Sequence, residues 1–212
     1  MKKLCLLFLF SAFLVMSCSH HIIRVACVGD SITEGYGLKV QSKSSYPVIL
    51  DSILGAKYSV LNCGRSGATL QKKGDFPYWT CKEFSNVFTY QPNIIIIKLG
   101  TNDTKPYNWY ADHFENDYQA LIDTFKTIPS KPEIYVCFPV PVFKTTWGIN
   151  DSTVLQGVIP IVEKLAEKNR LPIIDLYHGL LNDGANFPDS IHPSEKAVKV
   201  MAALIASTIS HK

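Results

Sequence analysis

The sequence has little net charge, and no lysine-rich run occurs in it. Its 212 residues carry 21 Lys and Arg against 18 Asp and Glu, a formal net charge of +3. Removal of the first 17 residues takes away Lys2 and Lys3 and leaves a net charge of +1. This balance argues against strong electrostatic attraction to a polyanion, so we expect no nucleic-acid partner.

The sequence also lacks a Cys-x-x-Cys pair or a Cys/His spacing typical of a metal site, so no metal or other cofactor is expected. Cys27 and Cys137 lie in apolar, strand-like runs and are predicted to be buried thiols. Cys63 and Cys81 lie in predicted loops. In an exported protein they could form a disulfide or stay free, and the sequence leaves both alternatives open.

One long apolar run is present, and it stands at the start of the chain. Leu4–Val15 follows two lysines and is too short to span a bilayer comfortably, as is typical of a signal peptide. Ser17 and Cys18 come next and resemble a bacterial lipobox. We expect a lipoprotein signal peptide over residues 1–17 and a short tether over residues 18–21 that begins with lipidated Cys18. An ordinary signal peptide and a retained membrane anchor are the alternatives.

Lipidation would attach the protein to a membrane of the cell envelope. The predicted location is the periplasmic side in a Gram-negative bacterium, with the membrane and leaflet left open.

Residues 22–212 contain no repeat, low-complexity stretch or linker and are predicted to form one domain. Apolar strand patterns alternate with helical patterns along it. Strands are predicted at 22–28, 57–61, 93–99, 133–138 and 171–176, and helices at 46–54, 109–128, 152–169 and 193–209. This alternation predicts an α/β fold with a mainly five-stranded parallel sheet and helices on both faces. The four consecutive isoleucines within 93–99 predict a strand buried on both faces.

Polar and glycine-rich clusters follow the first three predicted strands. They are Gly29-Asp30-Ser31, residues 62–67 and residues 100–103. In open parallel sheets, sites lie at the carboxyl ends of the strands. We therefore expect these three clusters to share one edge of the sheet.

Ser31 is the candidate nucleophile, although most serines that follow a strand are helix caps. A nucleophilic serine needs a base. His192 is the best candidate because Pro193 follows it and proline favours the first helical position, which predicts His192 as the N-cap of the last helix. Asp189 lies three residues earlier and could orient the imidazole, or it could merely cap a turn. His178 remains a second possible base.

Acyl transfer also needs hydrogen-bond donors for an oxyanion. The candidates are the Ser31 N–H, the backbone at Gly64 and the side-chain amide of Asn102. A simple turn at Gly64 and an Asx turn at Asn102 are the alternatives.

These motifs together resemble the SGNH, or GDSL-like, hydrolases. The four letters correspond in order to Ser31, Gly64, Asn102 and His192. The resemblance implies a flavodoxin-like three-layer α/β/α fold and ester hydrolysis through an acyl-serine intermediate, with Asp189 as the third member of the triad. It also implies structural roles for Asp30 and Asp103. The motif that gives the GDSL-like family its name ends in leucine. This sequence has Ile32 at that position, which is also apolar.

The substrate is less well defined by the sequence. Trp79, Trp109 and Trp147 lie in predicted loops or beside them, among lysines, and are candidate contacts to sugar rings, unless they pack the loops onto the core. The segments 99–106 and 139–144 are similar to envelope proteins of the same family that are assigned to removal of acetyl groups from glycans. The expectation is a carbohydrate O-acetylesterase. A lysophospholipase or thioesterase with the same triad, and a non-catalytic glycan-binding lipoprotein, are the alternatives.

Overall fold

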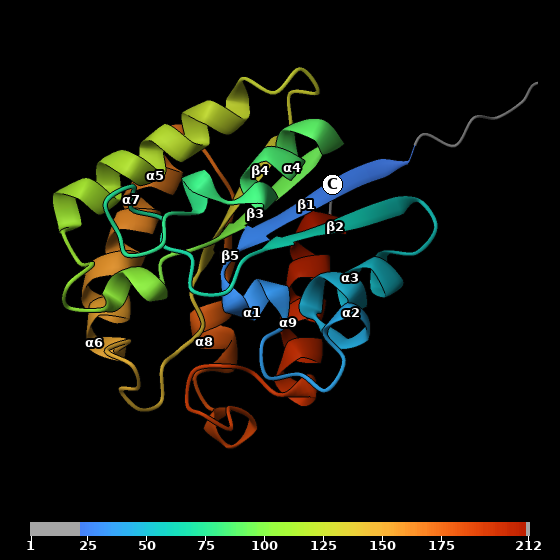
Figure 1. Ribbon diagram of the computed structural model, residues 1–212. Helices are drawn as coiled ribbons and strands as arrows, with labels where there is room; N and C mark the ends of the chain where they lie inside the picture. The colour runs from blue at the N-terminus through green and yellow to red at the C-terminus, as the bar shows by residue number, and fades with distance from the viewer. Residues whose placement is uncertain (1–21, 211–212) are drawn as a thin grey trace, which may run out of the picture.

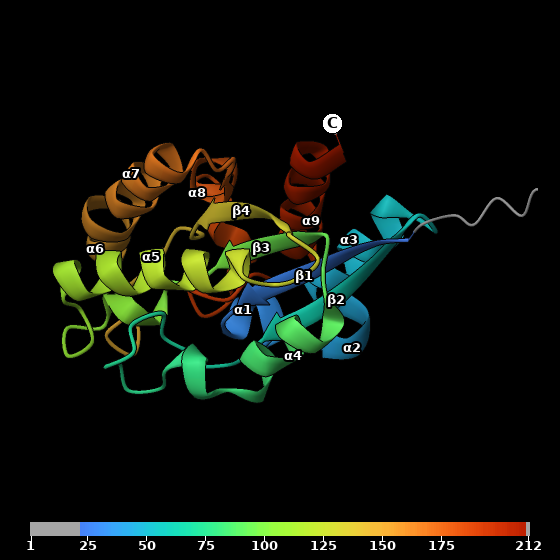
Figure 2. The same ribbon diagram turned by 90° about the horizontal axis from the view of Figure 1, so that it is seen from above.

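A central sheet lies between two layers of helices in the computed structural model, which describes residues 22–210 (Figures 1 and 2). Its five strands are β1 Ile23–Gly29, β2 Tyr58–Gly64, β3 Ile94–Lys98, β4 Glu133–Phe138 and β5 Ile173–Asp175. All neighbouring strands pair in parallel, in the order β2-β1-β3-β4-β5. The predicted five-stranded parallel sheet is confirmed.

The helices form two layers, as both views of the ribbon show. One layer holds α4 Lys82–Tyr90, α5 Ala111–Lys126 and α7 Ile159–Asn169, and the other holds α3 Tyr46–Leu54, α8 Leu176–Leu180 and α9 Glu195–Ser210. The shorter helices α1 Ser31–Glu34, α2 Gln41–Ser44 and α6 Asp151–Thr153 lie in loops at the sheet edge. Because both faces of the sheet are covered, the molecule has two hydrophobic cores.

Strand β3 shows how the two cores share one sheet. Ile95 and Ile97 are fully buried against the layer of α4, α5 and α7. Ile94 and Ile96 point to the opposite layer, with α3 and α9. Alternate residues of a strand face opposite sides, so a strand buried on both faces is apolar over most of its length. In β3 the first four residues are isoleucines, and only its last residue, Lys98, is charged. The prediction of a doubly buried strand is confirmed.

The helix predicted over residues 152–169, with Gly157 and Pro160 as points where it could bend, is present and contains one irregular turn. A π-helical turn, Val154–Val158, separates α6 from α7. Gly157 lies in this turn, and a Cβ there would stand 2.4 Å from a ring carbon of Trp109. Pro160 lies two residues beyond the π turn and has no N–H to donate to the preceding helical turn. The predicted helix is therefore present as one contiguous helical segment, and its π turn lies where Gly157 packs against the Trp109 ring.

The four described cysteines are free thiols, and all are buried. Cys27 and Cys137 are fully buried, as predicted. Cys63 and Cys81 are not paired. Cys63 lies inside β2 rather than in a loop, and burial raises the pKa of its thiol to about 12.

The predicted signal peptide, residues 1–17, and the tether with Cys18 lie outside the described residues. Between residues 22 and 210, no helix is long and apolar enough to cross a membrane.

Candidate active site

The turn from β1 into α1 places Ser31 at the edge of the sheet. Ser31 is the first residue of α1, and the Asp30 carboxylate caps that helix by accepting a hydrogen bond from the Ile32 N–H at 3.0 Å. A Cβ at Gly29 would stand 2.0 Å from the Thr33 hydroxyl and 2.8 Å from a backbone oxygen of β3. Only glycine fits here, so the sequence Gly-Asp-Ser brings the serine hydroxyl to the end of the strand.

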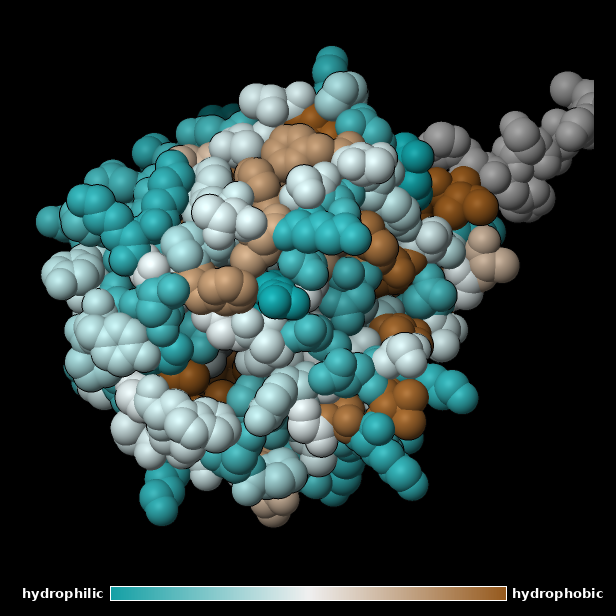
Figure 3. Space-filling view, viewed as in Figure 1, coloured by the Kyte–Doolittle hydropathy of each residue, from teal (hydrophilic) through white to brown (hydrophobic). Residues whose placement is uncertain are grey.

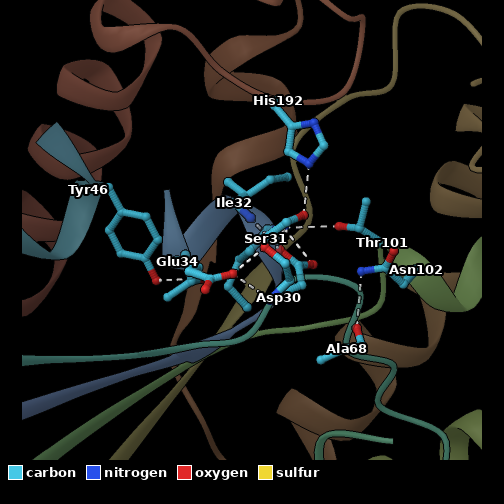
Figure 4. A network of polar contacts seen from close by, with 12 residues as sticks. Asp30, Ser31, Ile32, Glu34, Tyr46, Ala68, Thr101, Asn102 and His192 are labelled. Carbon is cyan, nitrogen blue, oxygen red and sulfur yellow. Dashed lines mark hydrogen bonds and ion pairs between the residues drawn. The ribbon is translucent and has the colours of Figure 1, made fainter. Parts of the chain in front are cut away.

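Ser31, His192 and Asp189 form one chain of hydrogen bonds. Ser31 Oγ lies 2.8 Å from His192 Nε2, and His192 Nδ1 lies 2.7 Å from Asp189 Oδ2. Ser31 and His192 are 8% and 7% exposed. In Figure 4, His192 points down onto Ser31 from a loop of the opposite end of the chain. The structure thus brings together the three residues that the sequence analysis named.

The Asp189 carboxylate is fixed by its own turn. Its Oδ1 accepts hydrogen bonds from the N–H groups of Ile191, at 3.0 Å, and His192, at 2.7 Å. Partial burial raises the pKa of Asp189, but these hydrogen bonds and the His192 side chain outweigh it, so the pKa is lowered overall. An ionised Asp189 accepts from Nδ1–H of His192, which leaves Nε2 to accept from the Ser31 hydroxyl.

His192 is not the N-cap of the last helix, contrary to the prediction. Helix α9 begins at Glu195, and the Val198 N–H donates to the Ser194 carbonyl at 2.9 Å, so Ser194 takes the N-cap position. Pro193 precedes this cap. The orientation of the His192 ring therefore comes from the Asp189 turn and not from the helix end.

A buried ion pair lies beneath Ser31. Lys98 Nζ is 3.0 Å from both carboxylate oxygens of Asp30, and both side chains are fully buried. The ammonium also donates to Thr101 Oγ1 at 3.0 Å. These contacts join the Ser31 turn to the loop after β3. Asp30 therefore contacts other parts of the site in the way that a structural role, as the resemblance implied, requires.

Asp103 joins the same β3 loop to the loop that follows β2. Its carboxylate accepts hydrogen bonds from the N–H groups of Leu70, at 2.9 Å, and Gln71, at 2.8 Å. Burial raises the pKa of Asp103 to about 6, although the two backbone donors oppose the shift. Asp103 thereby holds two site loops in register.

A cavity of about 230 Å³ opens beside the Ser31 hydroxyl. It is lined by Ser31, Tyr36, Ser66, Gly67, Asn102, Lys105, Trp147, Ile149 and His192. Asn102 is 4% exposed, and its Nδ2 donates one hydrogen bond to the Ala68 carbonyl at 3.1 Å (Figure 4). A side-chain amide carries two N–H donors, so the second is left for a group in the cavity.

Gly64 does not line this cavity, which corrects the sequence prediction. Its N–H donates to Asn62 Oδ1 at 2.9 Å, and a Cβ at this position would stand 2.2 Å from the Glu34 backbone nitrogen. Gly64 therefore permits close packing of β2 against α1.

Gly67 takes the place on the cavity that Gly64 was expected to occupy. It has a φ of +81°, and its neighbour Ser66 donates its N–H to Glu34 Oε2 at 2.7 Å. Sequence reasoning missed Gly67, although the segment 62–67 contains both glycines.

Of the three candidate tryptophans, only Trp147 lines the cavity. Trp79 donates its indole N–H to the Leu70 carbonyl at 2.8 Å and packs against Phe84, at 5.5 Å between ring centroids. Trp109 packs against Phe114, at 5.3 Å. These two rings attach loops to the core, so their predicted role as substrate contacts is withdrawn.

His178 also forms a pair with a carboxylate, Asp175, at 2.8 Å from Nδ1 to Oδ2. This pair is exposed, and neither residue lines the cavity. The part of the chain that the structure describes holds no cluster of three or more His, Cys, Asp or Glu side chains that could bind a metal ion.

Comparison with known proteins agrees with this geometry. A model of the GDSL-like Lipase/Acylhydrolase family matches residues 27–200. The chain belongs to this family. The resemblance found in the sequence is thus confirmed.

One relative is an acetylxylan esterase of Xylanibacter ruminicola, 40% identical over 206 residues that cover 88% of the chain and 43% of that protein. The chain thus spans less than half the length of this relative. Solved structures with the same fold include an aryl esterase of M. smegmatis, with a TM-score of 0.71 and 20% identity, and a carbohydrate acetylesterase of Sinorhizobium meliloti, with a TM-score of 0.70 and 19% identity. Both matches cover 89% of this chain and 98% of the other.

Proposed function

We propose that the protein is a serine esterase that removes O-acetyl groups from carbohydrates. The observation that carries the proposal is the hydrogen-bonded chain from Ser31 through His192 to Asp189, at the wall of an open cavity. The name of the acetylxylan esterase relative supports an acetylated polysaccharide as the substrate class.

The geometry supports general base catalysis by His192. Nε2 lies within hydrogen-bond distance of Ser31 Oγ and accepts its proton as the oxygen attacks the ester carbonyl. The Asp189 carboxylate stabilises the imidazolium that results. His192 then protonates the departing sugar oxygen, which leaves as the free hydroxyl, and the acetyl group remains on Ser31. A water molecule, deprotonated in turn by His192, attacks the acetyl carbonyl; the bond to Ser31 Oγ breaks, His192 returns the proton to Oγ, and acetate is released.

Three donors are available to the oxyanion in the proposed mechanism. They are the Ser31 N–H in the first turn of α1, the Gly67 N–H and the second N–H of the Asn102 amide. Donors fixed before the reaction stabilise the developing charge without reorganisation, and loss of one costs about 10²–10³-fold in kcat. Gly67 replaces Gly64 in this role because Gly67 lines the cavity and Gly64 does not.

Acetate release from acetylated xylo-oligosaccharides tests the proposal directly. Ser31→Ala and His192→Ala are each expected to reduce turnover to near the uncatalysed rate. Ser85→Ala is the matched control, because Ser85 is exposed on α4, where its hydroxyl bonds only the Lys82 carbonyl. It is expected to retain full activity.

An acyl-chain series identifies the substrate class. The expected result is the highest kcat/KM for acetyl esters, with a decline as the chain lengthens. A rise with chain length would instead identify a lipid or thioester acylhydrolase. Full activity in Ser31→Ala would overturn the nucleophile assignment whatever the substrate.

We propose in addition that the protein is an envelope lipoprotein attached to the membrane through Cys18. The support is the sequence alone, an apolar segment that ends in Ser17-Cys18. Incorporation of a labelled fatty acid into the wild type, and none into Cys18→Ser, is the expected result. Equal labelling of both proteins would contradict it.

A further inference from the structure

A tight hairpin turn after β4 carries Trp147 at its tip. Thr146 and Ile149 exchange two backbone hydrogen bonds, of 3.2 and 2.9 Å. Between them, Trp147 and Gly148 have φ values of +52° and +81°. Positive φ at both central residues is the requirement of a type I′ turn, which favours Asn-Gly, Asp-Gly or Gly-Gly. Tryptophan in the left-handed region costs roughly 1–2 kcal/mol, so the backbone does not favour the residue found here.

Core packing does not account for this tryptophan either. Trp147 is 58% exposed, among the most exposed large apolar side chains in the described part of the chain. Its ring lies on the cavity wall, 6.0 Å from the His192 ring between centroids. Tyr36, from the loop after α1, is 46% exposed, and its ring lies 4.6 Å from that of His192. Two exposed aromatic rings from separate loops therefore adjoin the candidate base.

Hydrogen bonds attach the loop that carries Trp147 to two other segments of the site. The Asn150 side chain donates to the Thr104 carbonyl at 2.8 Å, which attaches the turn to the segment that carries Asn102. The Phe143 N–H donates to the Ser190 carbonyl at 2.9 Å, which attaches the base of the loop to the Asp189–His192 turn. Strained conformations persist where the surroundings determine them, and they concentrate at functional sites.

The position of the ring decides which part of a substrate it would contact. In the proposed reaction the acetyl carbonyl lies against Ser31 and the oxyanion donors. The alcohol part is far larger and must extend through the mouth of the cavity. Figure 3 shows a hollow on this face of the molecule, with hydrophobic residues at its base and weakly hydrophilic residues around it.

We propose that Trp147 is a preformed stacking platform for the sugar ring that bears the scissile acetyl group, and so determines specificity for carbohydrate esters. The inference rests on the proposed function. A sugar ring has apolar C–H faces, and their burial against an aromatic ring removes apolar area from water. The folded protein already holds the Trp147 ring in place. Binding of the sugar therefore costs little additional side-chain entropy.

Two variants separate a platform from a structural role. Trp147→Asn removes the ring but installs Asn-Gly, the pair that a type I′ turn favours. Its melting temperature is expected to equal or exceed that of the wild type. Trp147→Phe keeps an aromatic face. Tyr110→Ala is the control, because Tyr110 is also 58% exposed but does not line the cavity.

The assay compares acetylated xylo-oligosaccharides with ethyl acetate, which has the same acyl group and no sugar. Trp147→Asn is expected to lower kcat/KM for the oligosaccharides by about tenfold, mainly through KM, and to change it less than about twofold for ethyl acetate. Trp147→Phe is expected to restore most of the loss, and Tyr110→Ala to match the wild type.

Equal effects on both substrates, or none on either, would overturn the platform while leaving the esterase assignment intact. A wild type that cleaves ethyl acetate but no acetylated saccharide would overturn the proposed substrate class and the platform with it. A wild type that cleaves neither ester would overturn the proposed esterase itself.

Discussion

The Asp189 carboxylate sets the tautomer of the candidate base through its hydrogen bond to Nδ1 of His192. In Asp189→Asn the amide N–H group can face Nδ1 and favour the wrong tautomer. We expect kcat to fall by about 10⁴-fold, as for the same change in a serine protease triad. Asp175→Asn is the matched control, because it breaks the same kind of pair with His178 away from the cavity. A comparable fall in both variants would contradict the assignment.

The two glycines of the loop after β2 are expected to respond differently to alanine. At Gly67 a Cβ would meet only Phe76, at 3.7 Å, but the φ of +81° is unfavourable for alanine, so the N–H would shift. At Gly64 the Cβ would stand 2.2 Å from backbone. Gly67→Ala should lower kcat by about 10²-fold or more, with a modest loss of stability. Gly64→Ala should mainly lower the free energy of unfolding. Urea unfolding and steady-state kinetics on both variants check this, and a reversed pattern would return the oxyanion role to Gly64.

The roles of site residues could be predicted from the sequence where they depend on contacts between residues close together in the chain. Asp189 and His192 are three residues apart, so their contact follows from one turn. The choice between Gly64 and Gly67 was not readable, because it depends on how closely β2 approaches Glu34 on another element. The prediction that Trp79 and Trp109 contact the substrate was wrong for the same reason, because only tertiary packing places their rings against the core.

At the scale of elements, Asp103 links the loops that follow β2 and β3. Its pKa of about 6 in the folded protein exceeds the value of about 3.9 for an unfolded chain. The folded state therefore binds this proton more tightly, so the contribution to stability is full below pH 4 and is lost as the pH rises through 6. The loss is on the order of 2–3 kcal/mol.

Urea unfolding at pH 4.5 and 6.5 checks this linkage. The decline in stability between these pH values is expected to be smaller in Asp103→Asn than in the wild type. Asp123→Asn, an exposed change on α5, serves as control and should keep the wild-type slope. An unchanged slope in Asp103→Asn would show that another group causes the dependence.

Elements with a strong apolar pattern were predicted well, and mixed segments were not. The four isoleucines of β3 predicted a strand, and the helical spacing of apolar residues in α3 predicted a helix. Helix α4 was missed because only Val87 among its residues is fully buried, so its pattern is weak. Gly157 and Pro160 indicated an irregularity in the helix over 152–169, and the structure has a π turn there, Val154–Val158.

At the scale of the whole molecule, the candidate site draws on loops from both ends of the chain. Ser31 follows β1, and His192 precedes α9, 161 positions later. Each helix layer packs a hydrophobic core against its own face of the sheet, and within the described residues both cores extend over most of the chain. The first strand is already anchored at its start, where the Ile23 N–H donates to the Lys57 carbonyl at 2.9 Å.

A variant that begins at residue 22 tests whether the predicted domain is self-sufficient. Because both cores and the hydrogen-bonded triad lie within residues 22–210, we expect a single cooperative unfolding transition. The free energy of unfolding should differ from that of the full chain by less than about 0.5 kcal/mol, and kcat/KM for a soluble acetyl ester should be unchanged. Thermal unfolding and kinetics on both proteins, in the same detergent, make the comparison. A broad transition or a lost activity would mean that the first 21 residues contribute to the fold, and the domain boundary at residue 22 would then be wrong.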